Sequence, residues 1–199
     1  MPKAVKTRRD LNSEATRRDI LAAAKTLFAR DGYATTPLSA IVEAAGVTTG
    51  AVYHHFGDKQ GLFRAVAEAV EVEILQRIAA ASAGETDLWR RLVAGTTAML
   101  GICAEPHIQR IAFIDAPNVI GAREWREIEK RYGFGVLQQS LHALQAGGVI
   151  RPCIVEILAP ILLGATIEAA TAIAEAADQP AALAEAQEII FRLLDSLRS

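Results

Sequence analysis

This sequence of 199 residues has little cysteine. It also lacks long uninterrupted apolar runs and an apolar stretch near its start. The two cysteines, Cys103 and Cys153, are too few for a disulfide framework, which fits a reducing compartment. The longest apolar runs are rich in alanine and interrupted by Glu, Thr and Gly, so we expect none to reach the roughly 20 residues of a membrane span. The first residues are basic and polar, unlike a secretory signal. We therefore expect a soluble, cytoplasmic protein without a membrane partner.

Signatures of catalysis are also missing. The sequence has no G-x-S-x-G elbow, no glycine-rich phosphate loop after a strand, no H-E-x-x-H pair and no cysteine cluster. A nucleophilic set of Cys103, His107 and Asp115 is conceivable, but nothing in the sequence fixes its geometry. We expect no enzyme, no cofactor and no metal. The enzyme alternative would require those three side chains to converge in a closed cleft.

What the sequence has in abundance is helical periodicity. Hydrophobic residues make up 51% of the chain and recur at three- and four-residue steps, without strand-like alternation. The pattern predicts an all-α fold. Beyond residue 84, helices are predicted near 86–104, 106–115, 122–146, 153–177 and 181–198, with breaks at Gly84, Pro106, Pro117, Gly147-Gly148, Pro152 and Pro180.

The first third of the chain has the outline of a helix-turn-helix unit: a helix, a short helix, a glycine turn and another short helix. The predicted boundaries are, in chain order, a stop at Gly32, a cap at Thr36 before Pro37, a stop at Gly46, a cap at Thr48 or Thr49, a stop at Gly57 and a cap at Asp58. In such a unit the helix after the turn enters the major groove of DNA, and residues near its N-terminus meet base edges.

Small and polar residues occupy that position here. Thr48, Thr49 and Gly50 would let the backbone approach DNA, and Tyr53 and His54, one turn later, can hydrogen-bond phosphate or base. Lys59 lies in the first turn of the next helix, where its cation and the helix N-terminus would attract a phosphate.

Other interpretations of this stretch compete with DNA contact. Tyr53 and Phe56 could be core aromatics, and for Phe56 the core is the better interpretation. A metal pair of His54 and His55 is weakly supported, because adjacent helical residues point about 100° apart and no Cys or carboxylate lies at ligand spacing.

Charge is distributed unevenly along the chain. Residues 1–60 hold nine Lys and Arg against six Asp and Glu, although the whole chain has a net charge of -2. Four of the positive charges lie within residues 1–12, which could form a flexible basic arm that contacts nucleic acid. A solvated tail with no partner is the alternative.

Residues 16–63 resemble the DNA-binding domain of the TetR family of bacterial transcriptional regulators. The stretches ILAAAKTLFARDGYATT and IVEAAGVTTGAVYHHFGDKQGLF, with their spacing, carry the resemblance over about a quarter of the chain. It implies phosphate contacts from Thr36, Tyr53 and Lys59, and base contacts from Thr48, Thr49, Gly50 and His54. Three departures are visible: Pro37 replaces a frequent hydroxyl residue, Val42 a usual alanine, and Gln60-Gly61 a usual acidic residue. The first removes one expected phosphate contact.

The larger remainder offers a candidate cavity and a candidate self-association face. Large apolar groups with a few polar tips could line a pocket for a small, mostly apolar ligand, the candidates being Trp89, Met99, Cys103, Phe113, Trp125 and His142. Ordinary core packing is the alternative. Small residues along 162–177 and a stripe of Leu183, Ala186, Ile190, Leu193 or Leu194 and Leu197 suggest self-association or, equally, intramolecular packing. The resemblance favours a homodimer built from the last two helices of each subunit.

Four segments follow from these patterns: the arm (1–12), a helix-turn-helix domain (13–60), a connecting helix (61–84) and a helical ligand-binding and dimerisation domain (85–199). The resemblance implies a repressor that a small-molecule effector releases from a palindromic operator in double-stranded DNA. A helical scaffold that binds only protein is the remaining alternative, and the basic front and the reading-helix pattern argue against it.

Overall fold

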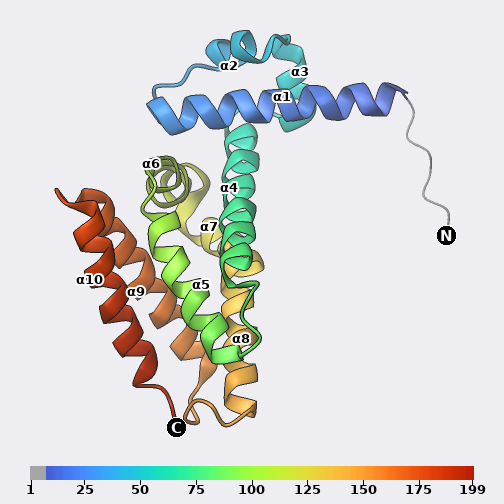
Figure 1. Cartoon of the computed structure of the whole chain (residues 1–199). Helices are drawn as coiled ribbons and strands as arrows, with labels where there is room; N and C mark the ends of the chain where they lie inside the picture. Colours follow the sequence, from blue (N-terminus) through green and yellow to red (C-terminus); the bar gives the residue numbers. More distant parts are fainter. Residues whose placement is uncertain (1–7) are drawn as a thin grey trace, which may run out of the picture.

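Helices account for nearly all of the regular structure in the computed structural model, which describes residues 8–199 (Figure 1). Within that range the single extended pairing is an isolated bridge between Ile150 and Arg198. The predicted all-α fold is confirmed. A long helix crosses one end of the molecule with two short helices beside it, and a second long helix descends from there into the larger helical part (Figure 1).

The N-terminal part consists of α1 (Arg8–Asp31), α2 (Leu38–Ala45), α3 (Thr49–Phe56) and the first turns of α4 (Lys59–Ser82). Helix α1 begins within the range 1–12 that the sequence suggested as a flexible arm, so residues 8–12 are helical instead. Residues 1–7 of that arm lie outside the described residues.

Local capping explains why the short helices start and stop where they do. Gly46 takes a φ of 64° and its N–H reaches the carbonyls of Val42 and Glu43, which closes α2 as a glycine C-cap. The side chains of Thr48 and Asp58 accept from backbone N–H groups at the starts of α3 and α4. These boundaries agree with the sequence prediction.

Thr36 is a correction. It was predicted to cap α2, but the cap position is Pro37, whose extended backbone has no side-chain cap bond. The Thr36 side chain is 1% exposed, and its hydroxyl donates to the Gly32 carbonyl at 2.7 Å. A threonine hydroxyl beside a free backbone carbonyl satisfies that carbonyl instead of a helix start. The residue fixes the α1–α2 connection from the inside.

The larger part contains wider π-helical segments among its α-helices. Its elements are α5 (Leu88–Cys103), α6 (Pro106–Ile108), η1 (Gln109–Asp115), η2 (Pro117–Gly121), α7 (Ala122–Glu129), η3 (Lys130–Phe134), α8 (Gly135–Ala146), α9 (Val155–Glu175) and α10 (Gln179–Asp195). Two predictions about this region are wrong. Pro117 does not break the chain, since proline is tolerated in the first turn of the helical segment it opens, and the break falls at Gly121, with a φ of 97°. The single helix predicted over 122–146 is interrupted at Tyr132, whose φ and ψ are -104° and -108°.

Helix α9 is long and strongly apolar. By length and composition it is capable of crossing a membrane, so the expectation that no run reaches that length is wrong. A core helix of a soluble protein passes the same test, and α9 packs against α5, α8 and α10. Within this single chain, however, only 22% of its most apolar window is buried. Much of the helix therefore faces outward.

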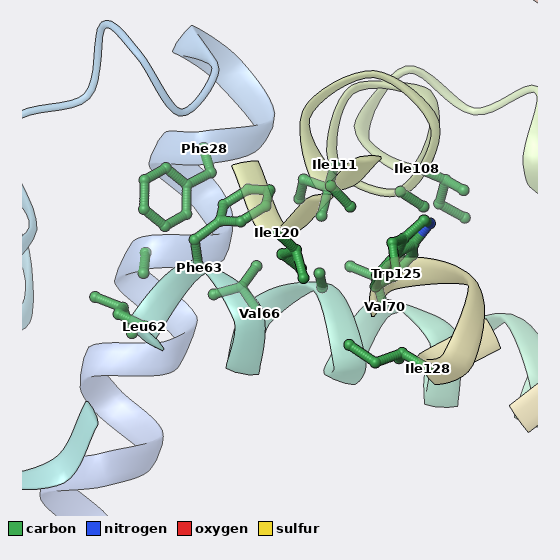
Figure 2. Close-up of a cluster of buried hydrophobic side chains, with 14 of the residues drawn as sticks. Phe28, Leu62, Phe63, Val66, Val70, Ile108, Ile111, Ile120, Trp125 and Ile128 are labelled. Carbon is green, nitrogen blue, oxygen red and sulfur yellow. The ribbon is translucent and has the colours of Figure 1, made fainter. Parts of the chain in front are cut away.

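One hydrophobic core joins the two parts of the molecule. Phe28 of α1 packs against Phe63 of α4, with ring centroids 5.2 Å apart. Figure 2 shows this pair beside Ile111 of η1, and the cluster continues to Trp125 and Ile128 of α7. A second cluster is formed by α5, α8, α9 and α10. Because side chains from both parts share the first cluster, α1 and α4 cannot shift without repacking against η1 and α7.

Candidate nucleic-acid interface and cavity

The first turns of α3 present the residues that the sequence assigned to DNA. Thr48, Thr49, Gly50, Tyr53 and His54 are all exposed. Positions 49, 50, 53 and 54 lie one turn apart, so they share one side of the helix. The opposite side carries Val52, which is fully buried, and the half-buried Phe56. Helix α3 is therefore held by its inner side and leaves a polar outer side.

Gly50 and Thr48 have distinct local roles. A Cβ added at Gly50 would meet nothing nearer than the Thr48 hydroxyl, at 3.8 Å. Packing within the chain therefore does not require glycine at this position. The Thr48 hydroxyl accepts from the Ala51 N–H at 3.3 Å, so this residue is occupied as the N-cap of α3.

Lys59 is held in place at the start of α4. Its ammonium donates to the Tyr33 carbonyl at 2.7 Å and lies 4.2 Å from the centroid of the Tyr33 ring. Partial burial lowers the pKa of Lys59. The contact fixes the lysine side chain against the loop between α1 and α2. Gly61, one of the departures from the family pattern, also belongs to this corner, because a Cβ there would lie 2.1 Å from the Phe56 carbonyl oxygen.

A cation of α1 that the sequence reasoning did not single out contacts α3. The Arg17 guanidinium lies 5.2 Å from the centroid of the Phe56 ring. His55 is partly buried nearby, and burial, with the neighbouring His54 and Arg17, lowers its pKa. The two histidine rings are 5.0 Å apart, and no group of three metal-ligating side chains occurs within residues 8–199. The stacking of an arginine on an aromatic at long sequence separation leaves no signal in the sequence.

Thr36 is the one sequence-predicted DNA contact that the fold removes from this surface. Its hydroxyl is buried and committed to the Gly32 carbonyl, so it cannot reach a phosphate in this conformation. The neighbouring Thr35 is exposed, and its hydroxyl donates to the Asp31 carbonyl.

A cavity of about 860 Å³ opens between α4, α5, α8 and α9. Three of the six predicted ligand-binding residues line it, namely Met99, Cys103 and Phe113. The other three do not. Trp89 is buried in the second core cluster under the Arg198 guanidinium, Trp125 is buried in the first, and His142 is exposed beside Glu156, at 3.3 Å. Periodicity marks a residue as inward-facing, but it does not say whether that residue meets a cavity or a packed core.

The connecting helix contributes a wall of the cavity that the sequence reasoning did not assign. Glu71 and Ile74 of α4 line it, together with Leu162 and Thr166 of α9 and Glu129 of α7. A signal for Glu71 was available, since it is a carboxylate in the apolar stripe of α4 between Val70 and Ile74. No comparable signal joins α4 to α9, which are far apart in the sequence.

Glu71 is the most perturbed carboxyl in the cavity. Its residue exposure is 8%, and burial, with a smaller contribution from Glu129, raises its pKa to about 8. Burial likewise raises the pKa of Glu129 and takes that of the Cys103 thiol to about 12. The cavity therefore holds a buried carboxyl group whose pKa lies well above its usual value.

Polar contacts connect the helix-turn-helix to the larger part. The Asp115 carboxylate in η1 accepts from the Tyr33 N–H at 2.8 Å. Lys25 of α1 pairs with Glu73 of α4, and Glu73 lies 3.4 Å from His107 of α6. These contacts tie α1 and the loop after it to α4 and η1, and α4 to α6.

The geometry also bears on the enzyme alternative. Asp115 is engaged by Tyr33, His107 lies beside Glu73 and Glu105, and the Cys103 thiol is fully buried with a raised pKa. A thiol with a raised pKa is a poor nucleophile. Each of the three side chains is thus engaged in its own surroundings.

The outer sides of α9 and α10 are rich in exposed large apolar residues. They include Ile157 and Ile161 of α9, and Ile189, Phe191 and Leu193 of α10. The stripe predicted for self-association proves to be largely the inner side, because Ile190 and Leu194 are buried and Leu183, Ala186 and Leu197 pack onto the same core. Intramolecular packing, the alternative, accounts for these five positions, whereas Leu193, the other residue that the pattern allowed, lies on the exposed apolar face beside them.

Comparisons with known proteins identify both parts of the chain. A family model described as "Bacterial regulatory proteins, tetR family" matches residues 20–66, and one described as "Tetracyclin repressor-like, C-terminal domain" matches residues 89–197. The crystal structure of a TetR-family transcriptional regulator from Pectobacterium atrosepticum is 35% identical, with 97% of this chain and 98% of that chain covered and a TM-score of 0.78.

Curated relatives agree with the family models. The HTH-type transcriptional regulator AcrR of Shigella flexneri is 45% identical over 62 residues, which are 31% of this chain and 29% of AcrR. The HTH-type transcriptional regulator HbdR of Aromatoleum sp. (strain CIB) is 32% identical over 148 residues, covering 70% of this chain and 62% of HbdR. The matched part thus spans less than two thirds of each of these relatives. These proteins are transcriptional regulators, not enzymes, and the chain belongs to the TetR family of bacterial regulatory proteins.

Proposed function

We propose that this regulator is a cytoplasmic, homodimeric repressor that binds a palindromic operator and leaves it when a small, mostly apolar molecule fills the cavity. The observation that carries the proposal is the outer side of α3, where exposed Thr49, Gly50, Tyr53 and His54 lie over a buried Val52. A short helix fixed from behind and polar in front is what major-groove binding requires.

Each residue has a proposed role in the complex. Thr49 and Gly50, with Thr48 at the cap, meet base edges, and His54 lies within one turn of them. Tyr53 and Lys59 contact phosphates on either side of the groove. Lys59 is suited to this role because its bond to the Tyr33 carbonyl uses one of its three N–H groups and leaves the others for a phosphate. Thr36 has no place in this set.

The dimer is proposed on the outer face of α9 and α10. Ile157 and Ile161 lie one turn apart on α9, are 56% and 61% exposed, and share their side of the helix with the exposed Gly164. A monomer rarely leaves such a row of isoleucines in water. A two-fold dimer would bury it and place two α3 helices on one duplex, which doubles the number of base contacts.

Helix α4 supplies the proposed link between cavity and DNA. Lys59 stands at its first residue and Glu71 twelve residues later, about 18 Å along the axis of a regular helix. A ligand that displaces the wall of α4 therefore moves the end that supports α3. The shared core around Phe28 and Phe63 transmits that motion to α1 (Figure 2).

Selection of binding sites from random duplex DNA tests the function. The purified protein should enrich a two-fold symmetric consensus at moderate salt. A protein-binding scaffold would enrich no sequence, and that result would refute the proposal.

A further inference from the structure

Lys59 lies where the local electrostatics disfavour a cation. It is the first residue of α4, and the N-terminus of a helix carries a partial positive charge that repels an ammonium. A lysine also has a flexible four-carbon stem, so its ammonium is free to occupy many positions. On these grounds alone, the Lys59 side chain should turn away from the helix end and remain mobile. A partner is needed to hold it in one place.

Tyr33 supplies that partner through two separate contacts. Its carbonyl accepts a hydrogen bond from Lys59 Nζ at 2.7 Å, and the centroid of its ring lies 4.2 Å from the same nitrogen. Any residue at position 33 has a backbone carbonyl, but only an aromatic side chain offers a ring face that attracts a cation. The ring contact therefore depends on the identity of this residue.

The Tyr33 ring is itself held in place. It packs edge-on against the Phe63 ring, with centroids 5.1 Å apart, and is tilted against the Phe28 ring at 5.7 Å. The backbone N–H of Tyr33 donates to the Asp115 carboxylate at 2.8 Å. The ring cannot turn away from Lys59 without leaving this aromatic cluster, so it is a firm support for the ammonium.

We propose that Tyr33 is a positioning residue for DNA binding, whose ring face holds the Lys59 ammonium where it meets a phosphate. This inference rests on the proposed function of Lys59 as a phosphate contact. An ammonium that is already in place loses less conformational freedom when DNA binds, and the complex gains affinity by that amount. Tyr33 contributes to DNA affinity through Lys59 and not through a contact of its own.

Core packing alone is the other role that these contacts allow for Tyr33. A purely structural Tyr33 would support α1 and α4 in general, so its loss would weaken DNA binding whether or not Lys59 is present. A positioning Tyr33 has no effect once Lys59 is removed. The two roles therefore differ in whether the effects of substitutions at positions 33 and 59 add.

A double-mutant cycle on the full-length protein tests the inference, with affinity for one fixed duplex measured by fluorescence anisotropy. Tyr33→Leu removes the ring face and keeps the carbonyl, and it should weaken binding by about three- to tenfold. In the Lys59→Ala background the same substitution should change affinity by less than about twofold. Tyr33→Phe keeps both contacts and should bind as the parent does.

Phe28→Leu serves as the matched control, since it removes a ring from the same cluster and leaves the Tyr33 ring in place. Any effect of Phe28→Leu on DNA affinity should be the same with and without Lys59. Thermal melts confirm that each variant is folded at the temperature of the titration. If Tyr33→Leu is unfolded there, Tyr33→Met, which fills more of the volume of the ring, replaces it in the cycle.

Two kinds of failure have different meanings. If Tyr33→Leu weakens binding equally in both backgrounds, or binds as the parent does, Tyr33 does not act through Lys59 and the inference is overturned. A Tyr33→Phe variant as weak as Tyr33→Leu would overturn it as well, because the ring face is then not the group that matters. If Lys59→Ala alone binds as tightly as the parent, the proposed phosphate contact itself fails, and the inference falls with it.

Discussion

The Asp115 carboxylate accepts a hydrogen bond from the Tyr33 N–H at 2.8 Å, and this contact joins η1 of the larger part to the loop between α1 and α2. The two residues are 82 positions apart in the sequence. Tyr33 also offers its carbonyl to Lys59, so one residue contacts both the junction and the proposed phosphate clamp. A shift of η1 relative to α4 would therefore reach Lys59 through a single residue.

Removing the Asp115 carboxylate should loosen this junction. We expect Asp115→Ala to lower the free energy of unfolding by about 1 to 2 kcal/mol, because the partly buried Tyr33 N–H loses its acceptor. It should also reduce the effect of an effector on DNA affinity, while the effector still binds the cavity. Urea denaturation and DNA-binding titrations with and without effector measure the two effects. Asp115→Asn keeps an acceptor oxygen and should behave nearly as the parent, and equal behaviour of Asn and Ala variants would refute the role of this bond.

Loss of the Lys59 cation should weaken DNA binding without changing sequence preference. Lys59→Ala should lower affinity for every duplex. It should also reduce the slope of log affinity against log salt by about one, because binding releases one counterion fewer from the DNA phosphates. Fluorescence anisotropy across a salt series measures both quantities. Lys130→Ala is the matched control, since Lys130 is an exposed lysine that pairs with Glu127 in the larger part. Parent-like affinity of Lys59→Ala at all salt concentrations would contradict the clamp.

The buried Glu71 makes stability depend on pH. Its folded pKa of about 8 lies above the ordinary 4.5, so the folded protein holds the proton more tightly. The contribution of protonated Glu71 to the free energy of unfolding is therefore fully present below about pH 4.5. It declines as the pH rises and Glu71 ionises in the unfolded chain, and it is lost above about pH 8. Glu71→Gln removes this titration. It should exceed the parent in free energy of unfolding by roughly 3 to 5 kcal/mol at pH 8 and by less than about 1 kcal/mol at pH 5.

Urea unfolding at both pH values measures the difference. The protein concentration is kept the same throughout, because the stability of a dimer depends on concentration. The other titratable groups lining the cavity near Glu71 are Glu129 and Cys103. The Gln substitution also removes the repulsion between the Glu71 and Glu129 carboxylates at high pH. This loss of repulsion adds to the gain in stability expected at pH 8. Glu127→Gln should follow the parent at both pH values. A gap between Glu71→Gln and the parent that does not grow with pH would contradict the assignment.

A charge on the outer face of α9 should separate the subunits. Ile161→Glu places a carboxylate where the proposed dimer buries an isoleucine, and the dissociation constant of the dimer should rise by about 100-fold or more. Sedimentation velocity measures the change, and affinity for a symmetric duplex should fall with it. Ile114→Glu is the control, since Ile114 is also an exposed isoleucine but lies on η1, away from that face. Unchanged sedimentation of Ile161→Glu would rule out this interface.

The helix-turn-helix was predictable because its boundaries are set by local chemistry. Gly46, Thr48 and Asp58 each act on backbone groups a few residues away, and such caps can be identified from the sequence alone. Thr36 shows the limit of this reasoning. A hydroxyl before a proline matches an N-cap pattern, but the Gly32 carbonyl competes for it, and that competition depends on the path of the chain.

The cavity and the outer face were less predictable because they depend on contacts between distant segments. Met99, Cys103 and Phe113 line the cavity, whereas Trp89 and Trp125 are equally apolar yet belong to packed cores. On α10 the periodic apolar stripe predicts which side of the helix is buried. In this fold that side packs against other helices of the same chain. The π-helical segments and the kink at Tyr132 shift the helical phase, which no period of 3.6 residues anticipates.

The most direct test of the central claim, that α3 reads bases in two symmetric half-sites, is site selection carried out in parallel on the parent and on Thr49→Ala. Thr49 is exposed and Thr48 supplies the cap, so the substitution should leave the fold intact. We predict a two-fold symmetric consensus for the parent and, for the variant, a changed base preference at one position repeated in both half-sites. An identical consensus for the two proteins, or no consensus for either, would contradict the account.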